Sequence, residues 1–570
     1  MLAGYRPRMP ALVLGPMLRH VESTEATVWM ETDAPCEVGV LGRAAPTFCV
    51  AGHHYALIEL TGLESGATLP YTVELDGAHV WPPPGDPFPQ PVIRPLQSNS
   101  EARLVFGSCR VSRPHEPPWT LDPGDDERGH GIDALRTLAL TLARGAAGDL
   151  PDCLLMLGDQ VYADDLSPPL HELTISRSDA TGAPRGRLGD FEEYAAAYRE
   201  AWSEPVIRWL LSTVPTAMIF DDHEIHAQWK ISQAWMDALW AQDWFDAHIA
   251  DGLMAYWVYQ HLGNLSCEEL RASDLYDHAR THDDAGAFLR KQMSDANHQP
   301  GHSRWSFSRD LGSARLVVID SRAGRVLDPG DRRMVDDGEW KWIVERCSGE
   351  HEHLLLASSV PFFLTQGLHH IEAWDEAVAD GAWGPPAAWV AERLRQTGVM
   401  DHWASFRRSF ERLTRLLREL ASGVHGDPPA SIVMLSGDVH HCYLAQIDLS
   451  PDVGAHTGVW QAVCSAYRKS LPPRERLVMR VGNSRIAGAL ARALSRTAGV
   501  KAPDVGWRLV EDPCYDNQIG TLELGPGRAR VRVQTTEGAD WREPLLRTVF
   551  EHELVSAGTP GERSPGAVVG

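Results

Sequence analysis

The sequence lacks a continuous apolar run of about 18 residues, so no membrane-spanning helix is expected. Its first twenty residues contain scattered Arg and Pro where a signal peptide needs an uninterrupted apolar stretch, and no twin-Arg signal is present. The nine Cys are odd in number and unclustered, which favours reduced thiols over a disulfide framework. These absences predict a cytoplasmic protein with no transmembrane segment.

Positive charge is also scarce, since 53 Lys and Arg stand against 77 Asp and Glu and give a net charge of −24. Nucleic acids bind to clustered Lys and Arg, so a nucleic-acid surface is excluded. A phosphate substrate is not excluded, because bound metal ions can attract an anion into an acidic protein. The 43% apolar and 23% charged residues are typical of a folded protein, and 570 residues predict a large catalytic unit with an accessory domain.

Residues 1–82 are predicted to form a small all-β domain, because short alternating runs follow one another between turn formers. These runs are 26–31, 36–41, 55–60 and 71–75. Their pattern resembles a fibronectin type III-like β-sandwich, for which a structural role is favoured. Residues 83–101 are interpreted as a linker whose many Pro exclude a regular element, and residues 546–570 as a tail that is disordered over its last fifteen residues.

Residues 102–545 alternate strands with helices, and polar side chains follow the apolar strands at once. The predicted strands are 103–106, 153–157, 217–220, 316–319, 354–357 and 432–435. In an open α/β sheet the site lies beyond the carboxyl ends of the strands, so one site at that edge is expected.

Three other stretches of this part have recognisable patterns. Helical insertions are predicted at 232–261 and 402–422, and a closing hairpin at 520–524 and 529–535. The segment 474–496 is basic and partly amphipathic; a solvated helix is favoured there over a membrane-surface or partner role.

Four clusters of potential metal ligands stand at the strand ends. The first contains Cys109 after Gly-Ser; taken alone, a buried thiol is the simpler interpretation, because a metal ligand must lose its proton. The second contains Asp159 after Gly158, with Tyr162 three residues later. Acidic loops are usually solvated, so this cluster alone is also weak support for a metal site.

The third cluster is Asp221-Asp222-His223-Glu224, whose crowded carboxylates raise one another's pKa, so that either they reach solvent or a metal ion compensates them. The fourth contains Asp438 and His440, which point the same way if the strand continues, whereas His441 faces away and is favoured as a bystander. Taken together, four such clusters predict a metal centre.

The types of ligand constrain the metal. A thiolate and a phenolate suit a trivalent or soft ion, so Cys109 and Tyr162 indicate iron. The surplus of carboxylates suits hard divalent ions such as Ca²⁺, Mg²⁺ or Mn²⁺. A structural zinc site would show paired Cys-x-x-Cys spacings, and the sequence has none. A mixed centre is therefore predicted.

The four clusters together resemble the PhoD-type alkaline phosphatases, a branch of the calcineurin-like metallophosphoesterases. They read GSC at 107–109, GDQVYADD at 158–165, DDHE at 221–224 and GDVHH at 437–441. With weaker matches at 320–325, 339–342, 401–403 and 516–518, the resemblance spans roughly 12–540. The chain departs from the pattern at 226–229, HAQW, where some members carry two Asn.

The resemblance implies an α/β fold, a metallophosphoesterase-type two-sheet sandwich flanked by helices and preceded by the small all-β domain. It implies Fe³⁺ with Ca²⁺ as the metal ions, with Mn²⁺, Mg²⁺ or Zn²⁺ as alternatives. The implied metal ligands are Cys109, Asp159, Tyr162, Asp222, Asp438 and His440. His223 matches the superfamily histidine that assists the leaving group.

The predicted function is hydrolysis of a small-molecule or lipid phosphate ester by a metal-activated hydroxide, with no protein partner evident. His223 would protonate the leaving alcohol. Arg110, Arg322 and Arg325 would hold non-bridging oxygens, with a structural ion pair as the alternative for each. A phospholipase-D-like phosphodiesterase is the alternative enzyme, and a non-catalytic metal-containing binding protein is the alternative of another class.

Overall fold

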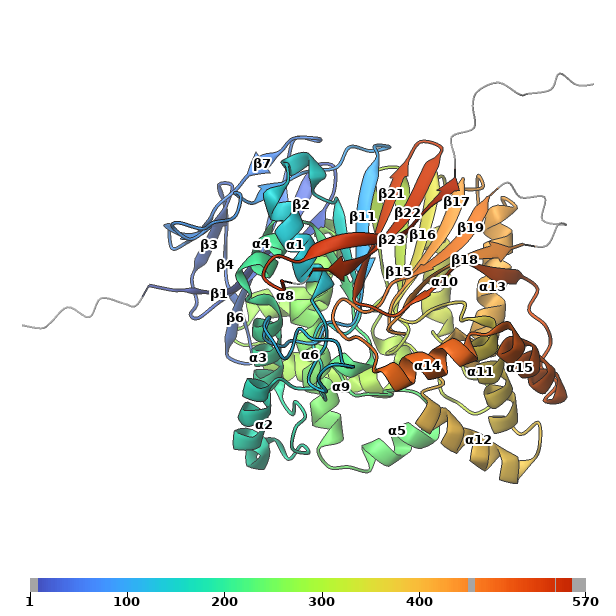
Figure 1. Ribbon diagram of the computed structural model, residues 1–570. Helices are drawn as coiled ribbons and strands as arrows, with labels where there is room; N and C mark the ends of the chain where they lie inside the picture. Colours follow the sequence, from blue (N-terminus) through green and yellow to red (C-terminus); the bar gives the residue numbers. More distant parts are fainter. Residues whose placement is uncertain (1–8, 450–456, 539, 556–570) are drawn as a thin grey trace, which may run out of the picture.

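The computed structural model describes residues 9–449, 457–538 and 540–555. Two β-sheets form the centre of its larger part, and helices cover them on both outer sides (Figure 1). The six-stranded sheet has the order β13-β12-β11-β21-β22-β23, and the seven-stranded sheet has the order β14-β15-β16-β17-β19-β18-β20. The predicted two-sheet α/β architecture is therefore confirmed.

The six-stranded sheet combines three parallel strands with three antiparallel ones. Its strands are β11 (Ala102–Gly107), β12 (Cys153–Leu157), β13 (Thr216–Ile219), β21 (Gln518–Gly525), β22 (Arg528–Glu537) and β23 (Leu545–Val555). All five residues of β12 are buried, as expected for a parallel strand covered on both faces.

The seven-stranded sheet has a parallel centre, β15-β16-β17-β19, with antiparallel strands at its edges. Its strands are β14 (Phe307–Leu311), β15 (Ala314–Ile319), β16 (His353–Ser358), β17 (Ser431–Ser436), β18 (Cys442–Asp448), β19 (Gly458–Val463) and β20 (Gly506–Cys514). Buried residues of both sheets belong to one hydrophobic core, so the two sheets pack as a single unit.

Helices connect and cover the strands. Before β14 these are α1 (Ala134–Arg144), α2 (Pro168–Thr181), α3 (Phe191–Trp202), α4 (Pro205–Thr213), α5 (Gln233–Trp240), α6 (Phe245–Tyr259), α7 (Cys267–Arg271), α8 (Asp274–Thr281) and α9 (Gly286–His298). After β15 these are α10 (Asp337–Cys347), α11 (Gln366–Ala379), α12 (Pro385–Gly398), α13 (Arg407–Ala421), α14 (Pro473–Gly482) and α15 (Arg485–Thr497). None of the helices in the described ranges is both long and apolar enough to cross a membrane.

The N-terminal part contains two four-stranded sheets, β1-β2-β6-β5 and β4-β3-β8-β9, and a short pair, β7-β10. The strands are β1 (Leu12–Val21), β2 (Glu25–Thr32), β3 (Glu37–Val40), β4 (Arg43–Pro46), β5 (Phe48–Val50), β6 (His53–Thr61), β7 (Leu69–Pro70), β8 (Val73–Leu75), β9 (Ala78–Trp81) and β10 (Val92–Ile93). Its inner face forms a separate core. The other face packs on the larger part, where buried Arg19 donates to the carbonyl oxygen of Gln260 at 2.5 Å.

The structure differs from the sequence prediction at two places. The Pro-rich stretch contains β10, whose two residues pair with β7, so the exclusion of a regular element is wrong there. β23 occupies 545–555 and pairs with β22, so the first ten residues of the predicted tail are a strand. The predicted disordered residues, 556–570, lie outside the described residues.

Candidate metal centre

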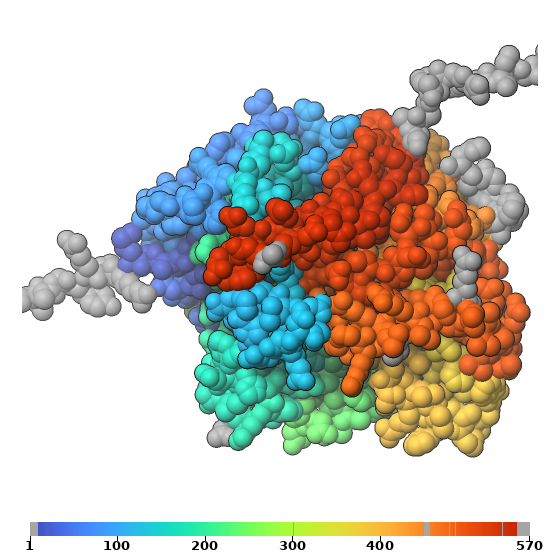
Figure 2. Space-filling model, in the orientation of Figure 1, coloured from blue at the N-terminus to red at the C-terminus, as the bar shows by residue number. Residues whose placement is uncertain are grey.

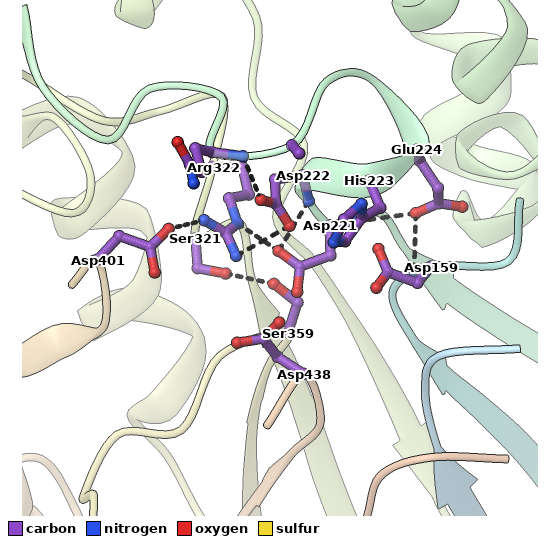
Figure 3. A network of polar contacts seen from close by, with 12 residues as sticks. Asp159, Asp221, Asp222, His223, Glu224, Ser321, Arg322, Ser359, Asp401 and Asp438 are labelled. Carbon is purple, nitrogen blue, oxygen red and sulfur yellow. Dashed lines mark hydrogen bonds and ion pairs between the residues drawn. The ribbon is translucent and has the colours of Figure 1, made fainter. Parts of the chain in front are cut away.

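The four predicted clusters meet at one edge of the two sheets, directly after β11, β12, β13 and β17 (Figure 3). Backbone contacts join them: Cys109 N–H donates to the Gly158 oxygen at 3.0 Å, and Asp438 N–H to Ser108 Oγ at 3.0 Å. Gly437 is required at this junction, because a Cβ there would lie 2.2 Å from Ser108 Oγ.

Several site residues have left-handed backbone conformations. The φ angles are 57° at Cys109, 55° at Asp159, 65° at Asp438 and 50° at His440. Non-glycine residues rarely adopt such angles, and they cluster at functional sites because the surrounding structure must hold them there. The surrounding loops therefore hold these residues in backbone conformations that are unfavourable by themselves.

Three buried carboxylates form the centre. One oxygen from each of Asp159, Asp221 and Asp222 lies within 4.8 Å of the others. Among the described residues, Asp159 Oδ1 and Asp221 Oδ2 are buried without a hydrogen-bond partner. Burial raises the Asp159 pKa to about 6; His223 opposes this rise, while Asp222 and Asp438 add to it. Buried carboxylate oxygens without partners are costly, and a cation between them relieves that cost.

Cys109 and Tyr162 lie at one end of this cluster. Cys109 Sγ is 3.4 Å from Asp159 Oδ2, and the Tyr162 hydroxyl is buried without a hydrogen-bond partner. Burial raises the pKa of both groups well above their usual values, and the Asp159 carboxylate raises them further. A bound cation would favour the thiolate and the phenolate instead, so this donor set fits a metal ion.

Glu224 ties the ends of β12 and β13 together. Its carboxyl group accepts hydrogen bonds from the backbone N–H of Asp159 and Gln160, both at 3.2 Å, and of Asp221 at 2.9 Å. Burial and the nearby Asp159 raise its pKa to about 8. Glu224 therefore positions the neighbouring carboxylates.

His223 lies at the open side of the centre, with 29% of its side chain exposed. Its Nδ1 is 2.8 Å from Asp164 Oδ1, and its ring centroid is 5.0 Å from that of Tyr162. Burial lowers the His223 pKa, but Asp222, Asp164 and Asp159 together raise it to about 10. The ring is thus held as a proton donor beside the centre.

Asp438 lies against a histidine to which the sequence interpretation gave no role. His402 Nε2 is 3.1 Å from Asp438 Oδ2, and His402 Nδ1 is 2.7 Å from Glu372 Oε1. Burial opposes protonation of His402, but Glu372 and Asp438 raise its pKa well above 6.5. His440, two residues after Asp438, has a pKa lowered to about 3 by burial and by the charge of Lys469, so it is neutral, as a ligand must be.

The predicted arginines are engaged by protein groups. Arg322 is buried among Asp221, Asp401 and Asp222, whose Oδ1 is 3.3 Å from its Nη2. Arg110 lies away from this cluster: its Nε donates to Asp133 Oδ2 at 2.8 Å, and its Nη1 to a backbone oxygen at 2.6 Å. Both have the ion pairs that were the structural alternative.

Arg325 and Lys469 complete the cations around the centre. Arg325 Nη1 lies 3.2 Å from Asp401 Oδ2. Lys469, which the sequence interpretation did not select, has its Nζ 3.8 Å from the centroid of the Tyr162 ring and 3.2 Å from Asp165 Oδ2. Its side chain is 20% exposed, so it is a partly exposed cation near the site.

Comparisons with known proteins identify the family of most of the chain. The model of the PhoD-like phosphatase family matches residues 139–507, and a domain of unknown function, DUF7800, matches residues 9–93. A search of curated proteins finds no match.

Two solved structures are similar. A structure of PhoD aligns with a TM-score of 0.58 at 11% identity, over 98% of this chain and 95% of that chain. Purple acid phosphatase PPD1 from yellow lupin (Lupinus luteus) seeds aligns with a TM-score of 0.43 at 13% identity, over 93% of this chain and 73% of that chain. Because the family model matches well over half of the residues, the chain belongs to the PhoD-like phosphatase family.

Proposed function

We propose that the chain hydrolyses phosphate esters, mono- or diesters, at a metal centre held by the four strand-end loops. Family membership supports a metal-dependent phosphoesterase in general terms. The observation that carries the proposal is the pair of buried, partnerless carboxylate oxygens of Asp159 and Asp221 beside Cys109 and Tyr162. A purely structural role does not need a thiol, a phenol and several carboxylates to converge, with left-handed backbone conformations at Cys109, Asp159 and Asp438.

We assign the metal ligands to Cys109, Asp159, Tyr162, Asp222, Asp438 and His440, with Asp221 added because its free oxygen faces the same space. The thiol and phenol end favours Fe³⁺, and the carboxylate end favours a hard divalent ion such as Ca²⁺. Metal ions bound there would supply Lewis acidity and lower the pKa of a water molecule toward neutrality.

The protein groups have separate tasks. His223, protonated and held by Asp164, would deliver its Nε2 proton to the oxygen of the departing alcohol. Lys469 would hold a non-bridging phosphate oxygen, because its ammonium is a partly exposed cation close enough to act on Asp159 and His440. Arg322 and Arg325 would hold Asp221 and Asp401 in place rather than touch substrate.

The decisive experiment combines metal analysis with turnover. Protein purified without chelator is analysed for iron and calcium, and hydrolysis of p-nitrophenyl phosphate is compared with that of bis-p-nitrophenyl phosphate. We expect bound metal and hydrolysis of at least one ester, and loss of hydrolysis on chelation. Metal-free, inactive protein would instead favour the alternative of another class, a non-catalytic binding protein. A cytoplasmic location stays a prediction, which fractionation of cells tests.

A further inference from the structure

The outer surface of α12, α14 and α15 carries most of the exposed apolar bulk of the protein. Of the fifteen large apolar side chains that are exposed in the described residues, nine lie on these helices or directly beside them. Six of them define an apolar helical surface: Trp389, Leu394, Leu477, Val481, Ile486 and Leu490. Ile486 is 75% exposed and Trp389 66%. A solvated helix turns charged residues outward and buries its apolar residues, whereas these helices also expose large apolar side chains.

The spacing of these residues is helical. Leu477 and Val481 are four residues apart on α14, and Ile486 and Leu490 are four residues apart on α15. Each pair therefore projects from one side of its helix. The two helices follow each other directly, since only Asn483 and Ser484 separate them, and they are called the α14–α15 segment below.

α11 connects α12 with α15. It packs against both α12 and α15, and Trp383 Nε1, beside α12, donates to the backbone oxygen of Thr497 at 3.2 Å. In Figures 1 and 2 this group lies at the lower right, where α12 is gold and α14 and α15 are orange to red. The apolar residues thus belong to one region of the molecule.

This region borders the candidate metal centre. α14 begins four residues after Lys469. Tyr515 links the α14–α15 segment to the GDVHH loop, because its ring centroid is 5.5 Å from that of His441 and its hydroxyl is 3.3 Å from Asn483. On the other side, the Ser232 hydroxyl at the start of α5 is bonded to Glu392 on α12.

The α14–α15 segment is basic, in contrast to the acidic chain as a whole. Residues 473–497 contain six Arg and one acidic residue, Glu475, in a protein whose net charge is −24. Arg474, Arg492 and Arg496 are exposed there. A pocket of about 270 Å³ beside α15 is lined by Arg492, Arg496 and Lys501, together with Asp504. Exposed apolar side chains and exposed arginines on the same helices are two features of helices that lie on anionic membranes.

We propose that the apolar helical surface docks the protein on a bilayer containing anionic phospholipid. The apolar side chains would enter the acyl boundary, Trp389 would lie at the level of the head groups, and the arginines would face lipid phosphates. Docked in this way, the protein places the mouth of its metal centre close to the lipid surface.

Charge argues against a second copy of the chain as the occupant. A two-fold contact through this surface would place the basic α14–α15 segment against its own copy. The repulsion between like charges across such an interface costs several kcal/mol. An anionic bilayer offers the opposite charge over an area that all three helices can reach.

Vesicle flotation tests the proposal with the whole protein. We expect binding to vesicles of phosphatidylcholine and phosphatidylglycerol in equal parts, and much weaker binding to phosphatidylcholine alone. The double variant Ile486→Asp/Leu490→Asp should weaken binding to the anionic vesicles about tenfold or more. Arg474→Glu/Arg496→Glu should remove the preference for the anionic vesicles, and added salt should weaken the wild type in the same way.

Val424→Asp is the matched control. Val424 is 67% exposed, like Leu490, but it lies in the loop that leads into β17, at the opposite edge of the sheet from the centre. It should bind vesicles as the wild type does, and all variants should keep the wild-type thermal unfolding midpoint. The proposal is overturned if the wild type does not bind anionic vesicles, if Val424→Asp loses as much binding, or if the variants unfold early. A wild-type dimer in sedimentation that Ile486→Asp/Leu490→Asp dissociates would overturn it too, in favour of a second copy.

Discussion

Replacing Asp164 with Asn removes the carboxylate that contacts His223 while keeping the shape of the side chain. The two groups are 2.8 Å apart, and the Asp164 side chain is only 9% exposed, so solvent screens the pair weakly. Asp222 and Asp159 also raise the His223 pKa. Metal ions bound to those two carboxylates would neutralise them, which leaves Asp164 as the group that keeps His223 protonated.

The expected shift follows from this contact. An opposite charge close by moves a pKa by about one to three units, and one unit corresponds to about 1.4 kcal/mol. Asp164→Asn should therefore lower the His223 pKa by at least about one unit. A general acid acts only while protonated, so the rate falls as pH rises through its pKa, and the basic limb of the pH–rate profile moves to lower pH by the same amount.

The assay measures kcat/KM against pH for an alkyl phosphate and for p-nitrophenyl phosphate. An alkoxide leaves readily only with a proton, whereas p-nitrophenolate is stable as an anion. His223→Gln should therefore slow the alkyl ester by about 10²–10⁴-fold and the nitrophenyl ester far less. Equal losses on both esters, or an unmoved basic limb in Asp164→Asn with the alkyl ester, would refute the assignment of His223 as the acid.

Four other changes test the remaining assignments. Asp159→Asn should reduce bound metal in elemental analysis and lower the phosphatase rate by at least the roughly 100-fold that even an outer partner of a metal site can cost. Tyr162→Phe should remove a visible absorption band from iron-containing protein, because that band requires a phenolate ligand. Lys469→Met should raise KM about tenfold, which corresponds to about 1.4 kcal/mol of binding. Arg110→Met should lower the free energy of unfolding, measured in urea, by about 3–5 kcal/mol, because it leaves the buried Asp133 carboxylate unpaired. Burial and His370 lower the His369 pKa from 6.5 to about 3, so the unfolded chain binds a proton at this residue that the folded chain does not. His369 should therefore lower the free energy of unfolding as pH drops below 6.5, by about 2 kcal/mol at pH 5. His369→Gln should remove this contribution when unfolding at pH 7 is compared with unfolding at pH 5.

The central strands were predictable because their burial is recorded in the sequence. β12 and β17 are runs of apolar residues bounded by polar ones, which is the pattern of parallel strands covered on both faces. β23 was not predicted, because an exposed edge strand carries charged residues between its apolar ones and reads as a tail. β10 was missed for a similar reason, since a strand of two residues in a Pro-rich stretch gives no periodicity.

The site residues divide in the same way. Cys109 and Asp159 follow strands directly, so their convergence could be inferred from topology alone. The partners of Arg110 and Asp438 could not be inferred, because Asp133 and His402 reach them only through the tertiary fold. A guanidinium looks the same in sequence whether it is paired or free.

Arg322 neutralises part of the carboxylate cluster and leaves the rest without a partner. Its guanidinium binds Asp401 and one oxygen of Asp221, whereas Asp159 Oδ1 and the other oxygen of Asp221 have no partner among the described residues. Such oxygens either take up protons, as the raised pKa of Asp159 indicates, or bind a cation. A bound cation would be favoured on the Asp159 side, next to Cys109, because the positive charge of Arg322 already compensates Asp401 and one oxygen of Asp221. A di- or trivalent ion there would reverse the local field, and this reversal would let a chain with a net charge of −24 attract an anionic ester to a site made of carboxylates.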